Sequence, residues 1–352
     1  MKNHEARKGQ LPEVAILRLS AIGDVVLCAA MALHLAKSRK FKITWITTNQ
    51  TEALLGEIEG IDFIIVPKPK NLKTFIECRK ILENRKFDFL LLVQASFSAH
   101  LVSINIKSKR KIGFDSKRSK DLHHFFIDEC VDASEEHFVD AYFSFSTKLG
   151  LPKPSKVEWS GLFTNQLKES LIADKLPPKK IIMAINPSAS KDERNWDEES
   201  YAKVINYAQE QGIKVVVIGG SGLREKEFNK RIAFKCKIPP INITGETKLE
   251  ELPYLLKNVD FLLAPDTGTI HIARAVGIPV IGLYAVANPF LTGPYQADEF
   301  SVNKHAQALI KFNKSNNRCF YSRVHDQKAM ALILVDEVIE RVDRVLKSLS
   351  LN

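Results

Sequence analysis

The sequence predicts an α/β fold made of two doubly wound, Rossmann-like domains that face each other across a cleft. Three observations lead to this prediction. Apolar segments typical of strands alternate with amphipathic segments typical of helices, first along residues 14–149 and again along residues 181–284. A segment rich in proline and small residues, 150–155, separates the two series. A chain of 352 residues is also long enough to build two hydrophobic cores.

The first series begins with a short apolar strand at residues 14–19. Val25, Ala29, Leu33 and Ala36 then recur at helical spacing, which predicts a helix directly after that strand. Further strands are expected at residues 42–48, 63–66, 87–93 and 111–114, and further helices at 72–84, 99–106 and 136–149. Because strands and helices alternate, the sheet should be parallel, with helices on both faces.

The second series follows the same plan. Its predicted strands are residues 181–185, 214–218, 241–243, 260–264 and 280–284, and its predicted helices are 198–211, 223–234, 249–257, 269–276 and 329–349. Gly212 stands where a glycine commonly ends a helix. The domain boundary is expected between residues 150 and 180, where the pattern is weak. Each domain should present its strand carboxyl ends to the cleft, which suits a reaction between two bulky partners.

Composition excludes several classes of protein. No apolar run approaches the roughly 20 residues of a membrane-spanning helix. Residues 1–14 are polar and charged, so a secretory signal is not expected. The five cysteines are scattered without the spacing of a metal or redox site, and we expect them to be reduced, most of them buried, in a cytoplasmic protein. They are Cys28, Cys78, Cys130, Cys236 and Cys319.

The formal net charge of +10 indicates attraction to an anionic partner, or simply a lysine-rich surface. Residues 107–120 concentrate this charge, with only Asp115 opposing seven basic side chains. The segment is either a solvated loop, or a loop that holds an anionic substrate or docks on acidic lipid. Sparse aromatic residues argue against a platform for single-stranded nucleic acid. The basic residues are Lys107, Lys109, Arg110, Lys111, Lys117, Arg118 and Lys120.

Asp24 lies in the turn after the first strand, at the start of the predicted helix. It could cap that helix, because aspartate accepts hydrogen bonds from free backbone N–H groups. It could instead be a general base at the cleft, although the positive end of a helix weakens a carboxylate as a base. Gly23 beside it would let a substrate approach the backbone closely.

Four loops of the second domain carry polar residues or glycines at predicted strand ends. Residues 186–190 (NPSAS), including Ser188 and Ser190, offer hydroxyl and N–H groups to phosphate. Arg194 could clamp phosphate oxygens or pair with a neighbouring acid, and Trp196 is better explained as core. Residues 219–222 are a glycine-rich turn, beyond which Glu225 could bind ribose hydroxyls or simply be solvated.

The most informative loop is the segment 264–271, APDTGTIH, which joins an apolar run to a short helix. A free helix N-terminus at the end of a parallel strand attracts phosphate, so this turn predicts a phosphate site. Taken singly, Asp266 could be an N-cap and His271 a buried core residue. The four loops together are harder to explain without a ligand, because all should lie at one edge of one sheet. The residues of this loop that we assign to the site are Asp266, Thr267, Gly268 and His271.

Three absences narrow the chemistry. The chain has no G-x-x-x-x-G-K-[ST] loop and no G-x-G-x-x-G after its first strand, which excludes a P-loop NTPase and argues against a dinucleotide-binding turn. It also has no Asp-x-Asp pair, a common means of holding Mg²⁺ against a diphosphate. The charge of a diphosphate would then be met by Arg194, hydroxyls and helix termini.

Four motifs in order along the chain resemble glycosyltransferase family 9, the ADP-heptose:lipopolysaccharide heptosyltransferases. They are LRLSAIGD at residues 17–24, KIGF at 111–114, the segment from Asp266 to Pro279, and TGPY at 292–295. The resemblance implies a GT-B fold with an acceptor-binding domain at 1–165 and a nucleotide-sugar-binding domain at 166–328. It also implies that the C-terminal helix, within 329–352, crosses back to the first domain.

The resemblance implies metal-independent, inverting transfer of heptose from ADP-L-glycero-D-manno-heptose to the lipopolysaccharide inner core, without a cofactor. Asp24 would be the catalytic base. The donor would contact Ser188, Ser190, Arg194, Glu225, Asp266, Thr267, Gly268 and His271. The anionic acceptor would contact Gly23, Arg110, Lys117, Arg118 and Lys120. The family usually has lysine and proline where this chain has Arg194 and Asp197.

Three alternatives stay open at this point. The enzyme could use a UDP- or GDP-sugar for another surface polysaccharide, or the chain could be a nucleotide-binding relative without activity. A nucleic-acid binder is supported only by the net charge. The lipid acceptor of the resembled family implies a cytoplasmic protein with peripheral contact to the inner membrane.

Overall fold

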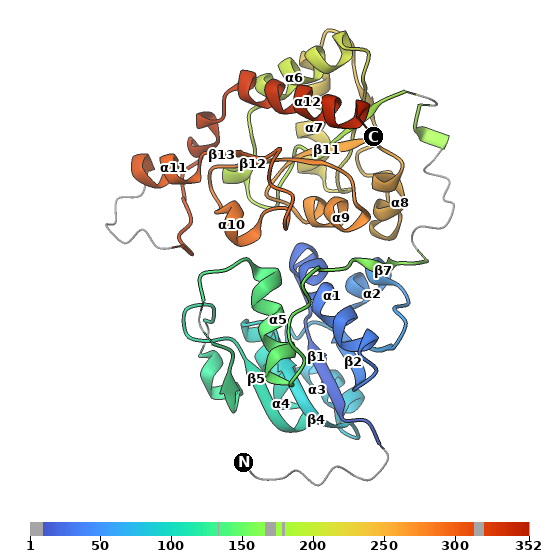
Figure 1. The fold of residues 1–352 in the computed structure, drawn as a ribbon, viewed down its shortest axis with the longest axis vertical. Helices are drawn as coiled ribbons and strands as arrows, with labels where there is room; N and C mark the ends of the chain where they lie inside the picture. The colour runs from blue at the N-terminus through green and yellow to red at the C-terminus, as the bar shows by residue number, and fades with distance from the viewer. Residues whose placement is uncertain are drawn as a thin grey trace. The chain divides into compact units, whose positions relative to one another are not determined.

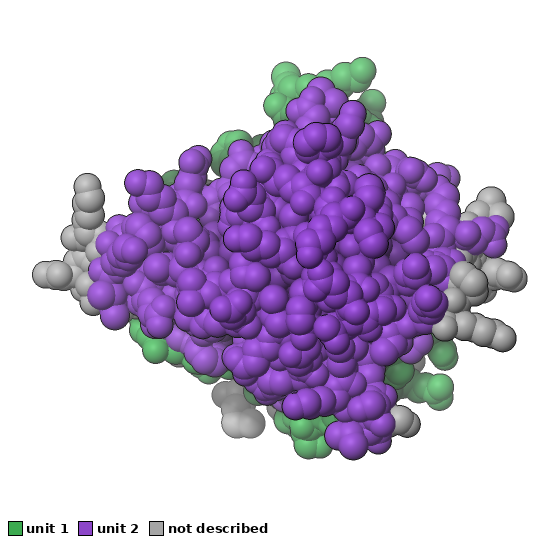
Figure 2. Space-filling model, turned by 90° about the horizontal axis from the view of Figure 1, so that it is seen from above, with its two compact units in different colours: residues 1–165 green, residues 166–352 purple. Residues whose placement is uncertain are grey.

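A computed structural model describes residues 10–120, 122–132, 134–165, 174–177, 180–312 and 320–351. The chain divides into two compact units, residues 1–165 and residues 166–352, coloured separately in Figure 2. Each unit is built around its own six-stranded sheet, in which every paired strand runs parallel to its neighbour. The predicted fold of two Rossmann-like α/β domains is therefore confirmed. Cys319 lies outside the described residues, as do residues 1–9, where no secretory signal is expected, and residues 166–173 and 178–179 of the predicted boundary segment.

The sheet of unit 1 has the order β3-β2-β1-β4-β5-β6. Its central strands are apolar on both faces, as expected for a parallel sheet covered by helices on each side. The order reverses between β1 and β4, and ligands of open α/β sheets bind at such a point. The strands are β1 (Glu13–Leu17), β2 (Lys42–Thr47), β3 (Ile61–Ile65), β4 (Lys86–Leu92), β5 (Lys107–Gly113) and β6 (Glu129–Cys130).

The helices of unit 1 begin at residues that the sequence indicates only in part. Helix α1 starts after Ala21, which makes no side-chain cap, whereas Asn71 and Thr74 form a reciprocal capping box at the start of α3. The sequence did not predict α2. The helices are α1 (Ile22–Lys37), α2 (Asn49–Leu55), α3 (Leu72–Leu82), α4 (Phe97–Ile104) and α5 (Phe138–Lys148), together with the 3-10 helix η1 (His123–Phe126); the short strand β7 (Ser160–Phe163) packs on α1 and α2.

The sheet of unit 2 has the order β10-β9-β8-β11-β12-β13, which again reverses at its centre. Its strands are β8 (Ile182–Ile185), β9 (Lys214–Val217), β10 (Ile241–Asn242), β11 (Phe261–Pro265), β12 (Val280–Tyr284) and β13 (Val302–Asn303). Its helices are α6 (Glu198–Glu210), α7 (Leu223–Lys235), α8 (Leu252–Lys257), α9 (Gly268–Val276), α10 (Pro289–Thr292), α11 (His305–Phe312) and α12 (Val335–Ser350). Short 3-10 helices precede α6, α8 and α12 at Asp192–Arg194 (η3), Leu249–Glu251 (η4) and Ala329–Leu332 (η5).

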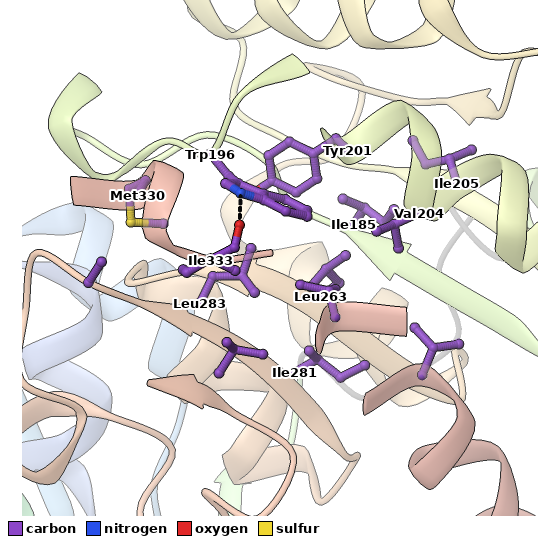
Figure 3. Close-up of a cluster of buried hydrophobic side chains, with 14 of the residues drawn as sticks. Ile185, Trp196, Tyr201, Val204, Ile205, Leu263, Ile281, Leu283, Met330 and Ile333 are labelled. Carbon is purple, nitrogen blue, oxygen red and sulfur yellow. Dashed lines mark hydrogen bonds between the residues drawn. The ribbon is translucent and has the colours of Figure 1, made fainter. Parts of the chain in front are cut away.

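Trp196 anchors the core between the sheet and α6, as its core interpretation predicts. Its indole Nε1–H donates a hydrogen bond of 3.2 Å to the carbonyl of Ile333, and its ring meets Tyr201 edge-on at 5.2 Å (Figure 3). The next residue, Asp197, is the N-cap of α6, and its carboxylate accepts a hydrogen bond of 2.9 Å from the N–H of Ser200. Asp197 therefore has a clear structural role at the position where the resembled family usually has proline.

The expected crossing of the C-terminal helix back to the first domain stays a prediction. Helix α12 packs on α6, β12 and β13, all within unit 2. The physical reason is its apolar stripe, because Val338, Val342 and Val345 recur at helical spacing and are fully buried in the core of unit 2. Figure 1 shows α12 lying along α6. We therefore place residues 335–350 in unit 2.

The cysteines and the membrane prediction can be examined in the part of the chain that the structure describes. Cys28 and Cys78 are buried and unpaired, Cys236 is half-buried and Cys130 is exposed, and none of the four forms a disulfide. Burial raises the pKa of the Cys28 thiol to about 12, so this thiol stays protonated. No helix among the described residues is long and apolar enough to cross a membrane.

Candidate functional site

Asp24 sits in the first turn of α1, just beyond the carboxyl end of β1. The N-cap of α1 is Ala21, so the cap alternative does not explain Asp24. Instead the Asp24 carboxylate pairs with the Arg18 guanidinium at 2.5 Å. The Arg18 side chain is 7% exposed and that of Asp24 is 38% exposed. Unit 1 therefore presents a partly exposed carboxylate that is paired with a buried arginine.

The end of β1 is fixed by hydrogen bonds from neighbouring strands. The second terminal nitrogen of Arg18 donates to the carbonyl of Val93 at 2.5 Å. The side-chain carbonyl of Gln94 accepts from the N–H groups of Leu19 and Ser20, at 2.7 and 3.2 Å. These bonds orient the Arg18–Asp24 pair before any substrate arrives. Sequence reasoning did not assign a role to Arg18, although it belongs to the motif at residues 17–24 and is an arginine inside an apolar strand end.

The basic segment differs from its prediction. Its first half is strand β5 rather than loop, and Arg110 pairs there with Glu129. The Arg118 side chain is 1% exposed and pairs with Asp115 at 2.5 Å and Glu136 at 3.1 Å. The structure thus shows Arg118 as a buried cation that joins two parts of unit 1, and its contact with the acceptor stays a prediction. Lys117 and Lys120 remain exposed.

A buried pair of histidines, His100 and His123, packs against the basic segment, residues 107–120. The N–H of Phe114 donates to Nε2 of His123 at 3.0 Å, so the neutral His123 carries its proton on Nδ1 and donates it to Nε2 of His100 at 2.9 Å. Burial, with His100 as a lesser cause, lowers the pKa of His123 to about 4. A Cβ on Gly113 would lie 2.3 Å from Nε2 of His123. The glycine of the 111–114 motif is therefore required for packing.

The donor-site residues predicted in unit 2 follow the carboxyl ends of β8, β9 and β11, which are neighbours in the sheet. The guanidinium of Arg194 pairs with Asp266 at 3.2 Å, and both side chains are largely buried. The amide of Asn186 donates to the hydroxyl of Thr269, in the first turn of α9, at 2.6 Å. These contacts bring the 186–194 and 266–271 loops together, as the sequence predicted. Gly268 begins α9, and His271 is buried one turn later.

Ser190 and Glu225 are held differently. Ser190 is exposed on its loop, whereas Ser188 is buried. The carboxylate of Glu225 accepts a hydrogen bond of 2.5 Å from the N–H of Gly220. A Cβ on Gly219 or Gly220 would come within 3.3 Å of that carboxylate. Glu225 therefore shapes the glycine-rich turn, and the two glycines give it the necessary space.

Five buried polar atoms gather around the Arg194–Asp266 pair without a hydrogen-bond partner among the described residues. Buried polar groups are normally satisfied, and each orphaned group costs about 1–3 kcal/mol. Such a concentration at one sheet edge indicates a polar ligand. The atoms are Oδ1 of Asn186, Oγ of Ser188, Nε of Arg194, Oγ1 of Thr267 and the hydroxyl of Tyr284.

Tyr284 is a site residue that sequence reasoning missed. It ends β12, where strand register places Leu283 opposite Pro265 and so brings Tyr284 beside Asp266. Burial raises the pKa of its phenol well above 10, and the nearby Asp266 charge raises it further, so the hydroxyl stays a hydrogen-bond donor. A Cβ on Gly282 would lie 2.5 Å from the Tyr284 ring, so the ring packs directly against that glycine. No sequence motif predicts that Tyr284 belongs to the site.

A pocket of about 340 Å³ opens beside the loop that follows β8. Ser188 and Trp196 form part of its wall, and two arginines of α7 form another part. Arg224 pairs with Asp192 at 2.7 Å, and Arg231 pairs with Glu198 at 2.6 Å, so much of the positive charge is already balanced. Among the described residues, no group of three or more His, Cys, Asp or Glu side chains could hold a metal ion.

Two parallel-sheet units, each with a polar strand edge, have the architecture of the GT-B class, and comparisons with known proteins identify the family. The sequence profile of glycosyltransferase family 9 (heptosyltransferase) matches residues 76–321. The lipopolysaccharide core heptosyltransferase OpsX of Haemophilus influenzae is 33% identical over 336 residues, covering 94% of this chain and 96% of the relative. The lipopolysaccharide heptosyltransferase 1 of Campylobacter coli is 25% identical, covering 77% and 83%.

Solved structures agree in fold. The family 9 glycosyltransferase of Veillonella parvula superposes with a TM-score of 0.77 at 21% identity, covering 96% of this chain and 97% of that one. The Escherichia coli heptosyltransferase WaaC, solved with ADP, gives 0.72 at 18% identity, covering 95% and 99%. The chain described here belongs to glycosyltransferase family 9, the heptosyltransferase family.

Proposed function

We propose that this enzyme transfers heptose from ADP-L-glycero-D-manno-heptose to the inner core of lipopolysaccharide, with inversion at the anomeric carbon. Its 33% identity along nearly the whole length of a lipopolysaccharide core heptosyltransferase supports the reaction class and the acceptor. Structural relatives were solved with ADP and with ADP-2-deoxy-2-fluoro heptose, which supports the donor.

Unit 2 binds the donor in this proposal. The observation that carries it is the group of five orphaned polar atoms around Arg194 and Asp266. Arg194 and the N-terminus of α9 offset the negative charge of the diphosphate, and the Ser188 and Thr267 hydroxyls donate hydrogen bonds to its oxygens. Because these groups are preorganised, they also stabilise the charge that grows on ADP as it leaves, without a metal ion.

Asp24 acts as the general base. It takes the proton of the acceptor hydroxyl as that oxygen forms a bond to the anomeric carbon, and the bond from this carbon to the ADP oxygen breaks in the same displacement. Arg18 orients the carboxylate through their ion pair. The exposed cations Lys117 and Lys120 attract the anionic acceptor.

Donor preference tests the proposal most directly. Calorimetry with ADP, UDP and GDP on the full chain should show binding of ADP at least about tenfold tighter, a difference of about 1.4 kcal/mol. Preference for UDP or GDP would replace the donor assignment. Transfer should then be measured with ADP-heptose and inner-core acceptors, and ADP binding without any transfer would favour a nucleotide-binding relative.

Ser188→Ala supplies a matched variant for the same experiment, because the Ser188 hydroxyl is buried without a partner. The substitution should leave the stability of the free protein unchanged while weakening ADP binding several-fold. Ser350→Ala is a suitable control, since Ser350 is an exposed serine at the end of α12, outside the four loops of the donor site.

A further inference from the structure

Large hydrophobic side chains are exposed on one region of unit 1. All but one of the exposed large hydrophobic residues described in this unit lie on α3, α4 and η1, and the exception is Leu11. Helix α3 contacts α4, and α4 contacts η1, so these elements are neighbours in unit 1, and we call their exposed side the α3–α4–η1 surface. Its exposed apolar residues are Leu72, Ile76, Ile81, Phe97, Ile104, Leu122 and Phe125.

The core of unit 1 does not account for these side chains. Of the eleven residues of α3, only Cys78 and Leu82 are fully buried. Leu72 and Ile76, four residues apart on one helix face, point away from the core and are 72% and 43% exposed. Phe125 is 71% exposed at the tip of η1. Several exposed apolar side chains on neighbouring elements indicate an interaction site.

The same surface is strongly basic. Residues 68–86, which include all of α3, carry seven lysines and arginines against only Glu77 and Glu83. All seven basic residues are exposed, and none of them forms a salt bridge among the described residues. They therefore differ from Arg110 and Arg118, whose charges are balanced inside unit 1. The seven are Lys68, Lys70, Lys73, Arg79, Lys80, Arg85 and Lys86.

The combination of exposed apolar and basic side chains decides which kind of partner fits the α3–α4–η1 surface. A second copy of the chain would bring two faces of equal positive charge together, which costs electrostatic energy. Nucleic acid would use the cations but would leave the aliphatic side chains of α3 without a partner. An anionic bilayer satisfies both, because lipid phosphates attract lysine and arginine while the apolar side chains enter the boundary between headgroups and acyl chains.

We propose that the α3–α4–η1 surface docks on an anionic phospholipid bilayer. The interaction extends the proposed function, on which its purpose rests, because it brings an enzyme without a spanning helix among its described residues to an acceptor that is itself a lipid. Docking needs neither donor nor acceptor sugar. Its failure can therefore be distinguished from a failure of the transferase assignment.

Vesicle sedimentation of the full chain tests the proposal. We expect binding to vesicles of phosphatidylcholine mixed with phosphatidylglycerol, little binding to phosphatidylcholine alone, and a decrease as salt rises, since salt screens the charges. The double variant Lys73→Glu with Lys80→Glu should weaken binding to the mixed vesicles by more than about tenfold. The double variant Leu72→Ser with Phe125→Ser should weaken it by a comparable factor without removing charge.

Matched controls come from unit 2. Lys203→Glu with Lys230→Glu makes the same change of charge at exposed positions, and Phe234→Ser removes a 90% exposed ring. Both should bind vesicles like the parent protein. Circular dichroism and ADP calorimetry should be unchanged in every variant, since all of these positions are exposed and lie outside the donor site.

Two results would overturn the proposal. One is equal binding of the parent and both α3–α4–η1 variants to the mixed vesicles. The other is an absence of vesicle binding by the parent, with sedimentation equilibrium showing a dimer that the Leu72→Ser and Phe125→Ser variant loses. That second result would assign the surface to a second copy of the chain.

Discussion

Each unit of this glycosyltransferase places an aspartate and an arginine together at the carboxyl edge of its sheet. The two pairs differ in how many of the polar groups around them have hydrogen-bond partners. In unit 1 both terminal nitrogens of Arg18 have partners, Asp24 and the Val93 carbonyl, and Gln94 bonds to the adjoining backbone, so that only Nε of Arg18 lacks a partner among the described residues. In unit 2 the Arg194–Asp266 pair is surrounded by polar atoms that have no hydrogen-bond partner among the described residues.

The two units therefore prepare two different kinds of site, one for catalysis and one for ligand binding. In unit 1 both terminal nitrogens of the arginine are engaged within the unit, so they hold one carboxylate in a fixed position, as a general base requires. The edge of unit 2 is completed by whatever supplies hydrogen-bond partners to its buried atoms, as a binding site for a polar ligand requires. Changes in unit 1 should therefore affect turnover or folding, and changes in unit 2 should affect ligand affinity.

The largest effect is expected from Asp24→Asn. It keeps the shape of the side chain and a hydrogen bond to Arg18 but removes the base, so kcat for heptose transfer should fall about 10²–10⁴-fold. ADP affinity, measured by calorimetry, should stay within about twofold, because an affinity change of that size is well under 1 kcal/mol. A variant that turned over at the parental rate would remove Asp24 from the mechanism.

Gly113→Ala should give the next largest effect, on folding. The new Cβ would meet both Nε2 of His123 and Cγ2 of Ile127 at 2.5 Å or less. Overpacking of this kind destabilises a core by about 1–3 kcal/mol, and we expect the upper end because two neighbours must move. Urea unfolding measures the loss. Gly222→Ala is the control, since a Cβ there meets nothing within 4 Å.

Acid should weaken unit 1 through His123. Its pKa is about 4 in the folded chain and about 6.5 when unfolded, so the unfolded state binds more protons between these values. The contribution of neutral His123 is complete above pH 6.5 and is lost as the pH falls towards 4. Between pH 7 and pH 5 the loss is about 2 kcal/mol.

Other groups also titrate in this range, so the informative quantity is the difference between variants. His123→Phe should reduce the dependence of unfolding free energy on pH by about that 2 kcal/mol relative to the parent protein. If the variant kept the parental pH dependence, the buried neutral pair would not be the cause.

Tyr284→Phe should give the smallest effect and the sharpest test of unit 2. The hydroxyl has no partner in the described structure, so its removal should leave stability unchanged or raise it by up to about 1 kcal/mol. ADP should bind about fivefold more weakly, because the ligand loses a hydrogen bond of about 1 kcal/mol. Tyr201→Phe is the counterpart, since its hydroxyl already donates to the carbonyl of Pro187.

The opposite pattern for these two tyrosines would contradict the proposed contrast between the units. If Tyr284→Phe destabilised the free protein and left ADP affinity unchanged, its hydroxyl would be structural. The polar groups at the edge of unit 2 would then serve the fold, as the groups that orient Arg18 do in unit 1.

Much of the fold could be predicted from the sequence, because alternating apolar and amphipathic segments report local periodicity. Trp196 was correctly interpreted as core, since a large aromatic beside a helix start has few other uses. Asp24 and Asp266 were singled out because they follow apolar strands directly. The direction of α12 was not predictable from its apolar stripe, which shows that the helix is buried on one face but not which domain covers that face.

The chain by itself determined which residues follow which strands, and thereby the two sheet edges and their acidic residues. Only the tertiary structure decided the partners. Arg118 meets Glu136 and is withdrawn from solvent, and Tyr284 reaches Asp266 through the register of β11 with β12. These contacts join residues 18 positions apart in either case, and the order and register of strands, rather than local periodicity, bring such residues together.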